Sequence, residues 1–267
     1  MKSGAAADDG AAPVAEARPR PALIGVPAQP GPPAAETAPR RPGARRRRLL
    51  RLLPTPTGTP FTFTYALILI GTSLFTEFAD PDTVARALRA SSTDVTHLAQ
   101  SPVLVLTASA LWIVGGVASP FMIAFVVVLT ALERRTGGRR TAAVFVLGHV
   151  LATLATEIPV GLSVMVGHLP DTSLHRLDYG VSFGLAASIG ALAGLLTPWP
   201  RYAVLLVFGA MLIGDLLTFA DPMTSWGHLL ALAVGVATWP LPRRRRNRAP
   251  GLPADSSRTA RRSATPA

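Results

Sequence analysis

Residues 177–194, with the sequence LDYGVSFGLAASIGALAG, form an apolar segment that is unusually rich in small side chains. In lipid, helices associate by close approach of their backbones, and small residues at the contact make this approach sterically feasible. The segment is therefore predicted to be a membrane helix that packs inside a bundle rather than one that faces lipid. It carries Ser182 two residues after Gly180. The commonest role of such a serine is a hydrogen bond to a carbonyl of the preceding turn, so a catalytic role requires a base opposite it.

The composition indicates a membrane protein. The 267-residue chain is 49% hydrophobic and has a mean hydropathy of +0.37, values typical of integral membrane proteins. Its net charge of +11 comes from the two ends: residues 1–53 hold ten Lys and Arg against four Asp and Glu, and residues 241–267 hold eight against one. No basic patch with interleaved aromatic residues is found, so no nucleic-acid partner is expected. The absence of cysteine excludes disulfides, thiol catalysis and thiolate metal sites, and neither a cofactor nor a metal is expected.

The two charged ends are predicted to lie outside the folded domain. Residues 1–53 have almost no large apolar side chains, so they are predicted to be a disordered basic tail, as are residues 241–267. The first apolar segment, residues 61–78, is close to a full span, which argues against a signal peptide. The membrane domain is assigned to residues 54–240. The bias toward Ala, Arg, Pro and Gly suggests a bacterial source and hence a bacterial plasma membrane.

Six segments are predicted to span the bilayer, at residues 61–78, 119–132, 141–165, 180–196, 202–219 and 226–239. The apolar segment 102–116 has only fifteen residues, fewer than the roughly 20 that a spanning helix needs, so it is expected to be re-entrant or interfacial. With six spans, both termini lie on the same side as the arginine-rich loop 133–140. Positively charged residues are retained in the cytoplasm, so this side is predicted to be cytoplasmic. A seventh span would place one arginine-rich tail outside.

Ser182 and His228 are the candidate catalytic residues. In the six-span arrangement each lies near the outer end of a helix that runs inward, so both are predicted at the same depth. An imidazole within hydrogen-bond reach activates a serine hydroxyl by taking its proton. The spacing also allows a simpler interpretation, in which the histidine lies at a helix interface and the serine caps a helix.

The order of these motifs resembles the rhomboid family of intramembrane serine proteases. The sequence GVS at residues 180–182 opens one helix, and HLLALAVG begins at His228 two helices later. The family has a GxSG motif on the fourth of six helices and an HxxGxxxG motif on the sixth. The charged loop at Glu133 is similar to the family's loop after its second helix, and the segment 102–116 is similar to part of its long first loop. The resemblance extends over approximately residues 61–239.

The resemblance implies a six-helix, all-α membrane bundle that cleaves a transmembrane helix entering from the lipid bilayer. Ser182 would be the nucleophile and His228 the general base. Two glycines of the family motifs are replaced here. Phe183 stands after the serine and is expected to crowd the substrate, and Ala231 stands at the first glycine of the last motif.

A third departure concerns the oxyanion hole. The family's second helix carries an HxxxN pair, but residues 119–132 contain neither His nor Asn. His149 and Thr153 have this spacing, yet they follow the arginine-rich loop and so belong to the third helix. Removing one oxyanion donor costs about 10²–10³ in rate in soluble proteases, so backbone amides near Ser182 are expected to take this role.

Three ionisable residues lie inside predicted spans: His149, Glu157 and Asp215. Such residues are costly in lipid and are functional candidates by default. They are predicted to support the catalytic pair or to make hydrogen bonds between helices, and a proton or ion path is the third interpretation. Asp178, just before Gly180, is predicted to cap the start of the next helix, where a carboxylate is favourable.

Three functions are therefore open: intramembrane serine proteolysis, non-catalytic binding of transmembrane helices by a rhomboid-like protein, and transport that uses Glu157 and Asp215. The sequence GVSFG also matches the nucleophile elbow of soluble hydrolases, which needs a strand, a turn and a helix. The flanks here are a polar loop and a membrane helix, so that interpretation is disfavoured. The arginine runs are predicted to anchor the topology and to contact anionic lipid headgroups.

Overall fold

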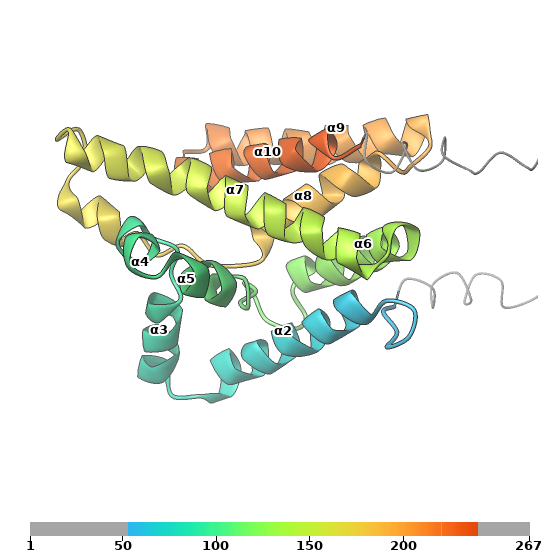
Figure 1. The fold of residues 1–267 in the computed structure, drawn as a ribbon, viewed down its shortest axis with the longest axis horizontal. Helices are drawn as coiled ribbons and strands as arrows, with labels where there is room; N and C mark the ends of the chain where they lie inside the picture. The colour runs from blue at the N-terminus through green and yellow to red at the C-terminus, as the bar shows by residue number, and fades with distance from the viewer. Residues whose placement is uncertain (1–52, 220, 240–267) are drawn as a thin grey trace, which may run out of the picture. The chain divides into compact units, whose positions relative to one another are not determined.

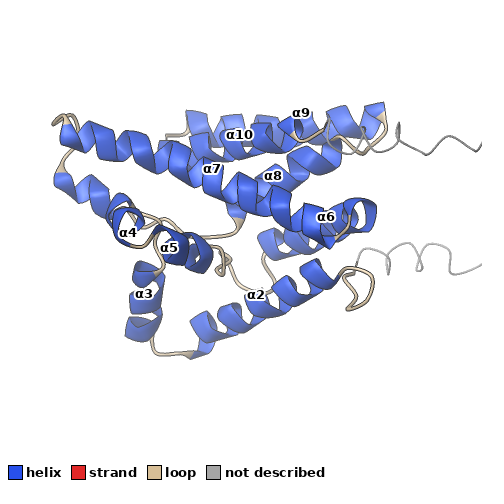
Figure 2. Ribbon diagram, viewed as in Figure 1, coloured by secondary structure: helices blue, strands red, loops and turns tan. Residues whose placement is uncertain are grey.

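The structure is a computed structural model that describes residues 53–219 and 221–239. Within these ranges every regular element is a helix, as Figure 2 shows. The all-helical class predicted from the sequence is thus confirmed for the described part of the chain. The predicted disordered tails, residues 1–53 and 241–267, lie outside the described residues except for Leu53.

The elements in chain order are α2 (Pro60–Phe78), α3 (Pro81–Ala90), α4 (Val95–Gln100), α5 (Pro102–Ser109), α6 (Pro120–Thr136), α7 (Gly138–Met165), the 3-10 helix η1 (Asp171–His175), α8 (Ser182–Ala193), α9 (Pro198–Leu217) and α10 (Pro222–Ala237). Six of them begin with a proline in the first turn, where its missing amide is not needed and its φ suits a helix. For this reason α9 and α10 start at Pro198 and Pro222, four residues earlier than the apolar pattern predicted.

In the described part of the chain, three helices are long and apolar enough to cross a membrane: α2, α7 and α9. Helices α6, α8 and α10 are shorter, with 17, 12 and 16 residues. Helix α5, in the segment 102–116, has eight residues, and a helix of that length rises only about 12 Å, well below the roughly 30 Å of a hydrocarbon core. Figure 1 shows α3 lying across the direction of α2 and α7.

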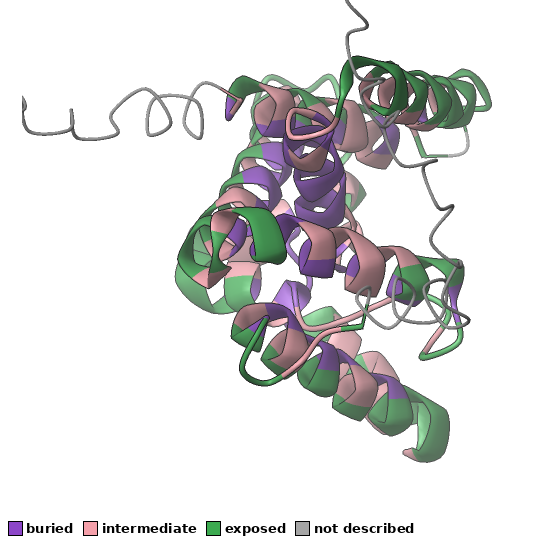
Figure 3. Cartoon of the chain, turned by 90° about the vertical axis from the view of Figure 1, so that its right-hand side faces the viewer, coloured by how far each residue is buried: buried purple, intermediate pink, exposed green. Residues whose placement is uncertain are grey.

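Helix α8 is the most completely buried helix of the bundle. Ten of its twelve residues are buried, and Figure 3 shows buried residues concentrated on the inner helices, with exposed residues on the outer ones. At Ala187 glycines face α8 from two sides. A Cβ at Gly148 of α7 would overlap the Ala187 side chain, and one at Gly235 of α10 would overlap its carbonyl oxygen. The three backbones thus come into direct contact, as the small-residue pattern predicted.

A buried carboxylate attaches α2 to α6. Glu133, near the end of α6, accepts hydrogen bonds from the amides of Phe61 (3.0 Å) and Thr62 (2.8 Å) and from the Thr62 hydroxyl (2.6 Å). Amides of a first helical turn have no partner within their own helix, and Thr59 supplies no side-chain cap for α2. Glu133 therefore caps α2 from another helix. Sequence reasoning had treated Glu133 only as part of a charged loop.

Candidate functional site at the start of α8

Ser182 is placed by the two residues before it. Gly180 has φ = +129°, a backbone conformation that favours glycine. The amide of Gly180 donates to the carbonyl of Ser109 (2.9 Å), and the amide of Val181 donates to the carbonyl of Trp112 (3.1 Å). These bonds attach the end of the loop to the segment that follows α5. As a result α8 begins at Ser182, whose side chain is half-buried.

His228 lies in the second turn of α10 and is also half-buried. Its ring meets the edge of Phe183, the residue after the candidate nucleophile, with the ring centroids 5.1 Å apart and the planes 72° apart. The two helices approach closely further along, where a Cβ at Gly190 or Gly235 would overlap backbone atoms of the opposite helix. The prediction that small residues allow α8 and α10 to come into contact is therefore confirmed.

Ser182 and His228 line the same pocket, which has a volume of about 370 Å³. The other lining residues come from the segment after α5, from the start of α6, from the loop before α8 and from the start of α10: Ile113, Val114, Phe121, Leu177, Asp178, Tyr179, Gly180, Val181, Asp221 and Thr224. No hydrogen bond joins Ser182 to His228 in the described ranges. The tertiary structure therefore brings the two predicted residues to one cavity without placing them in hydrogen-bond contact.

The N-terminus of α8 opens at this pocket without a side-chain cap. Val181 is the residue before the helix and cannot cap it, so amides of the first turn remain available to an anion. The predicted cap by Asp178 is not formed. Its carboxylate instead accepts a hydrogen bond from Thr93 (3.3 Å) and lies 3.8 Å from Arg176, because the loop turns Asp178 toward the segment between α3 and α4.

Arg176, which sequence reasoning missed, connects three carboxylates, of which Asp178 and Asp221 line the pocket. Its guanidinium is paired with the buried carboxylate of Glu157 on α7, and it lies 3.4 Å from Asp221. Glu157 thus contributes to the site through Arg176. The one signal in the sequence that could have pointed to Arg176 was its position in a predicted outer loop, where arginine is uncommon.

The pKa values of two of these carboxylates are shifted in opposite directions. Burial raises the pKa of Asp178 above its ordinary value, and the nearby Arg176 only partly offsets this. For Asp221 burial also acts to raise the pKa, but hydrogen bonds from Thr224 and the charge of Arg176 outweigh it and leave the pKa below its ordinary value. Of the two carboxylates that line the pocket, Asp221 therefore keeps its negative charge to a lower pH than Asp178.

The structure places His149 away from Ser182 and His228. Its Nε2 lies 3.1 Å from the Ser109 hydroxyl and 3.1 Å from the Leu106 carbonyl, and it lines a different cavity of about 220 Å³ between α2, α5 and α7. A carbonyl oxygen only accepts, so Nε2 carries the proton and cannot take one from Ser109. This second Ser–His pair therefore fastens α5 to α7 rather than forming a catalytic dyad.

Asp215 and Phe183 are the two remaining predicted residues. Asp215 is exposed on α9, and its carboxylate makes no hydrogen bond or ion pair within residues 53–219 and 221–239. Phe183 does not line the pocket. It is 3% exposed, and its ring occupies the space next to Gly227 and Thr156. The expected crowding of substrate by Phe183 is thus replaced by a packing role between α8 and α10.

The described residues contain no group of three or more His, Asp or Glu side chains arranged to hold a metal ion. The groups that the structure places at the site are a hydroxyl, an imidazole, backbone amides and the carboxylates around Arg176.

Comparison with protein families gives a match to the family described as rhomboid-like protein over residues 57–248. The match covers well over half of the chain, so the chain belongs to the rhomboid-like family, and the resemblance noted in the motifs is confirmed. With its all-helical fold and membrane-length helices, it is a rhomboid-like membrane protein. Comparisons with curated proteins and with solved structures found no match.

Proposed function

We propose that this protein is an intramembrane serine protease in which Ser182 is the nucleophile and His228 the general base. The observation that carries this proposal is that both residues line one pocket at the start of α8. Catalytic contacts are often longer in an unliganded enzyme and tighten when substrate binds. The mechanism requires His228 and Ser182 to come within hydrogen-bond distance when substrate is bound.

In this mechanism the Ser182 hydroxyl attacks the scissile carbonyl carbon while His228 takes the hydroxyl proton. Uncapped amides of the first turn of α8 stabilise the oxyanion, which replaces the side-chain donors missing from α6. The C–N bond then breaks as His228 returns the proton to the leaving amine. A water molecule, deprotonated by His228, hydrolyses the acyl-serine and restores the hydroxyl.

The proposal includes the topology. Helices α2, α6, α7, α8, α9 and α10 are the six spans, with both termini and the arginines of the α6–α7 turn in the cytoplasm. The Ser182 pocket then lies near the outer face of a bacterial plasma membrane, and the substrate is a transmembrane helix that enters from the bilayer. A reporter fused at Gly138 should report a cytoplasmic position and one at Thr172 an external position. A cytoplasmic result at Thr172 contradicts the six-span arrangement.

The second candidate is a non-catalytic rhomboid-like protein that binds membrane helices. It is favoured by the edge contact between Phe183 and His228 together with the absence of an HxxxN pair on α6. Transport receives less support, because Glu157 is engaged by Arg176 and Asp215 is exposed on α9.

A serine-directed fluorophosphonate probe separates these candidates. The folded parent protein should be labelled, and Ser182→Ala and His228→Ala should each abolish labelling, because the two residues act in one step. Ser188→Ala is the matched control: it lies on the same helix, and its hydroxyl only donates to the Gly184 carbonyl (2.8 Å), so labelling should be retained. An unlabelled, folded parent that still binds a reporter transmembrane helix would reject proteolysis in favour of binding.

A further inference from the structure

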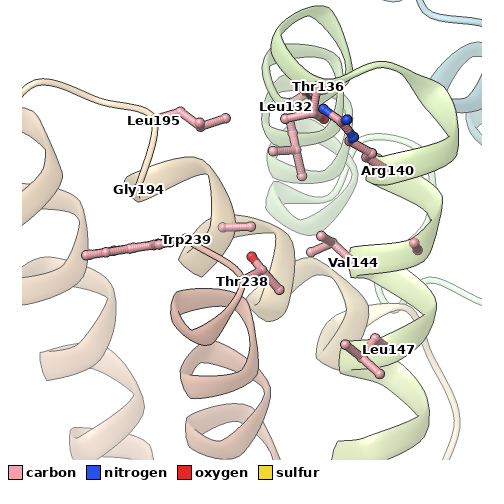
Figure 4. A pocket seen from close by; sticks show the side chains of 11 residues that line it. Leu132, Thr136, Arg140, Val144, Leu147, Gly194, Leu195, Thr238 and Trp239 are labelled. Carbon is pink, nitrogen blue, oxygen red and sulfur yellow. Dashed lines mark hydrogen bonds between the residues drawn. The ribbon is translucent and has the colours of Figure 1, made fainter. Parts of the chain in front are cut away.

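A third pocket lies at the opposite end of α8 from Ser182. It has a volume of about 290 Å³ and is formed where α6 and α8 end, where α7 begins and just after α10. Figure 4 shows Leu132, Val144, Leu195 and Thr238 around a common space between these elements, with the Trp239 ring extending to one side below Gly194. An apolar cavity of about 150 Å³ is enough to hold benzene, so this pocket has room for part of an alkyl chain.

The pocket wall is mostly apolar, and its shape is fixed by polar contacts behind it. Its apolar lining includes Leu132, Val144, Leu147 and Leu195. Trp239 forms one side: its indole nitrogen donates to the carbonyl of Gly190 (2.8 Å), and the Arg201 guanidinium lies over its ring at 5.2 Å from the centroid. The indole is thus held in place without any contribution from a ligand.

Among the residues that the structure describes, Arg140 is the only charged one that lines this pocket. The figure places its guanidinium at the edge of the space, beside Thr136. It makes no ion pair with any residue of the described ranges. The nearest buried carboxylate in sequence, Glu133, is already occupied by the first turn of α2. The hydroxyls of Thr136 and Thr238 are likewise bonded to carbonyls of their own helices.

An apolar pocket with one available cation at its rim matches an amphiphile with an acidic headgroup. The helix ends around it carry Arg134, Arg135 and Arg139 as well as Arg140, so this end lies at the charged boundary of the bilayer. Basic pockets between membrane helices on the cytoplasmic side bind anionic lipid headgroups, and each basic residue contributes about 1 kcal/mol near such a surface.

We propose that this pocket binds an anionic phospholipid of the cytoplasmic leaflet, with one acyl chain between α7, α8 and Trp239 and the phosphate on Arg140. The lipid would fill the gap between the ends of α6, α7, α8 and α10, and would stabilise the bundle because it binds only the folded state. The site is separate from the Ser182 pocket, so the proposal stands or falls independently of proteolysis.

The test uses phosphatidylglycerol that carries a photoactivatable diazirine in its acyl chain, added to the full-length protein in a neutral detergent. Irradiation should attach the lipid to pocket residues, chiefly Val144, Leu147 and Ala191, as mapped by peptide mass spectrometry. Phosphatidylcholine with the same chain should label these residues about fivefold less, the factor that corresponds to one lost charge contact. Glycerol phosphate, which has no acyl chain, should not compete.

Three variants sharpen the test. Arg140→Gln should lower labelling by phosphatidylglycerol to the level of phosphatidylcholine, and Arg139→Gln, a neighbour that does not line the pocket, should leave it unchanged. Ala143→Phe should abolish labelling inside the pocket by filling it, with Leu147→Trp as the substitute if that variant does not fold. Thermal unfolding confirms that each variant is folded.

Equal labelling by the two lipids would overturn the proposal, since the charge of the headgroup would then not contribute to binding. An equal loss in Arg139→Gln and Arg140→Gln would also overturn it, since the attraction would then be general to the arginine-rich surface. Competition by glycerol phosphate would overturn it in favour of a free phosphate site. Undiminished labelling in folded Ala143→Phe or Leu147→Trp would overturn the proposal, because the acyl chain would then lie outside the pocket.

Discussion

Helices α8 and α9 follow each other in the chain and are both apolar, but they occupy opposite environments. Of the twelve residues of α8 ten are buried, whereas of the twenty residues of α9 only Leu212 is buried. On α9 large side chains such as Leu206 and Val207 are more than 70% exposed. Apolar character alone thus does not decide which helix enters the centre of a membrane bundle.

Side-chain size separates the two helices. Helix α8 is made largely of Gly, Ala and Ser, and its backbone touches those of α7 and α10 at Ala187. Helix α9 also has glycines, Gly209 and Gly214, but a Cβ at either would meet no atom within 4 Å. A glycine permits close packing only where a neighbouring helix presents small residues at the same level. The predictions below test this contrast, from the largest expected effect to the smallest.

Gly235→Leu should remove the folded state. A side chain at this position would overlap the carbonyl group of Ala187, and backbone atoms cannot move aside as a side chain can. The loss should exceed the roughly 1–3 kcal/mol of ordinary overpacking. The matched change on the outer helix, Gly214→Leu, should leave folding unaffected. Yield of monodisperse protein and its thermal midpoint measure both, and equal damage in the two variants would contradict the contrast.

Phe183→Ala should lower the free energy of unfolding by about 3–5 kcal/mol, because it leaves a cavity between α8 and α10. Its aromatic counterpart on α9, Tyr202→Ala, is 63% exposed and should change the free energy of unfolding by less than about 0.5 kcal/mol. Unfolding in mixed micelles with increasing denaturing detergent provides the measurement. Similar values for the two variants would mean that α9 is packed as firmly as α8.

Arg176→Gln should destabilise the fold by about 3 kcal/mol, because it leaves the carboxylate of Glu157 buried without its partner. The value lies at the low end for a broken buried pair, since the Arg176 side chain is 24% exposed. Arg89→Gln on the exposed face of α3 is the control and should have no effect. The double variant Arg176→Gln with Glu157→Gln should recover part of the loss. A strictly additive double variant would show that the pair does not act as a unit.

Asp221→Asn should have the smallest effect, and the effect should be present near neutral pH and disappear in acid. The pKa of Asp221 in the folded protein lies below its ordinary value of 3.8, so its contribution is present above that value and is lost as the pH falls through the folded pKa. Asparagine keeps the cap on α10 but loses the charge contact with Arg176. Because the side chain is 51% exposed, we expect a difference of a few tenths of a kcal/mol.

Thermal midpoints between pH 6 and pH 3 check this prediction. The parent should lose slightly more stability than Asp221→Asn across the acid part of that interval, and the two should differ by a constant amount above it. A variant that follows the parent at every pH would show that Arg176 draws no stability from Asp221.

Local features of the sequence determined the membrane environment, the helical class, the family and the identity of the most tightly packed helix. Hydropathy, side-chain size and motif order are properties of short stretches, so they can be read without knowing which segments meet. Ser182 and His228 line one pocket, and their equal depth in a six-span arrangement stays a prediction.

The tertiary structure alone decided which groups face one another. Arg176 pairs with Glu157 from another element, Asp178 turns toward Thr93 instead of capping α8, and Phe183 packs against His228 instead of entering the pocket. Glu133 caps a helix that lies 71 residues away in sequence. Such partners depend on how helices rotate about their axes and on how loops return between them, and these are set by the packing of the whole bundle rather than by the composition of any one segment.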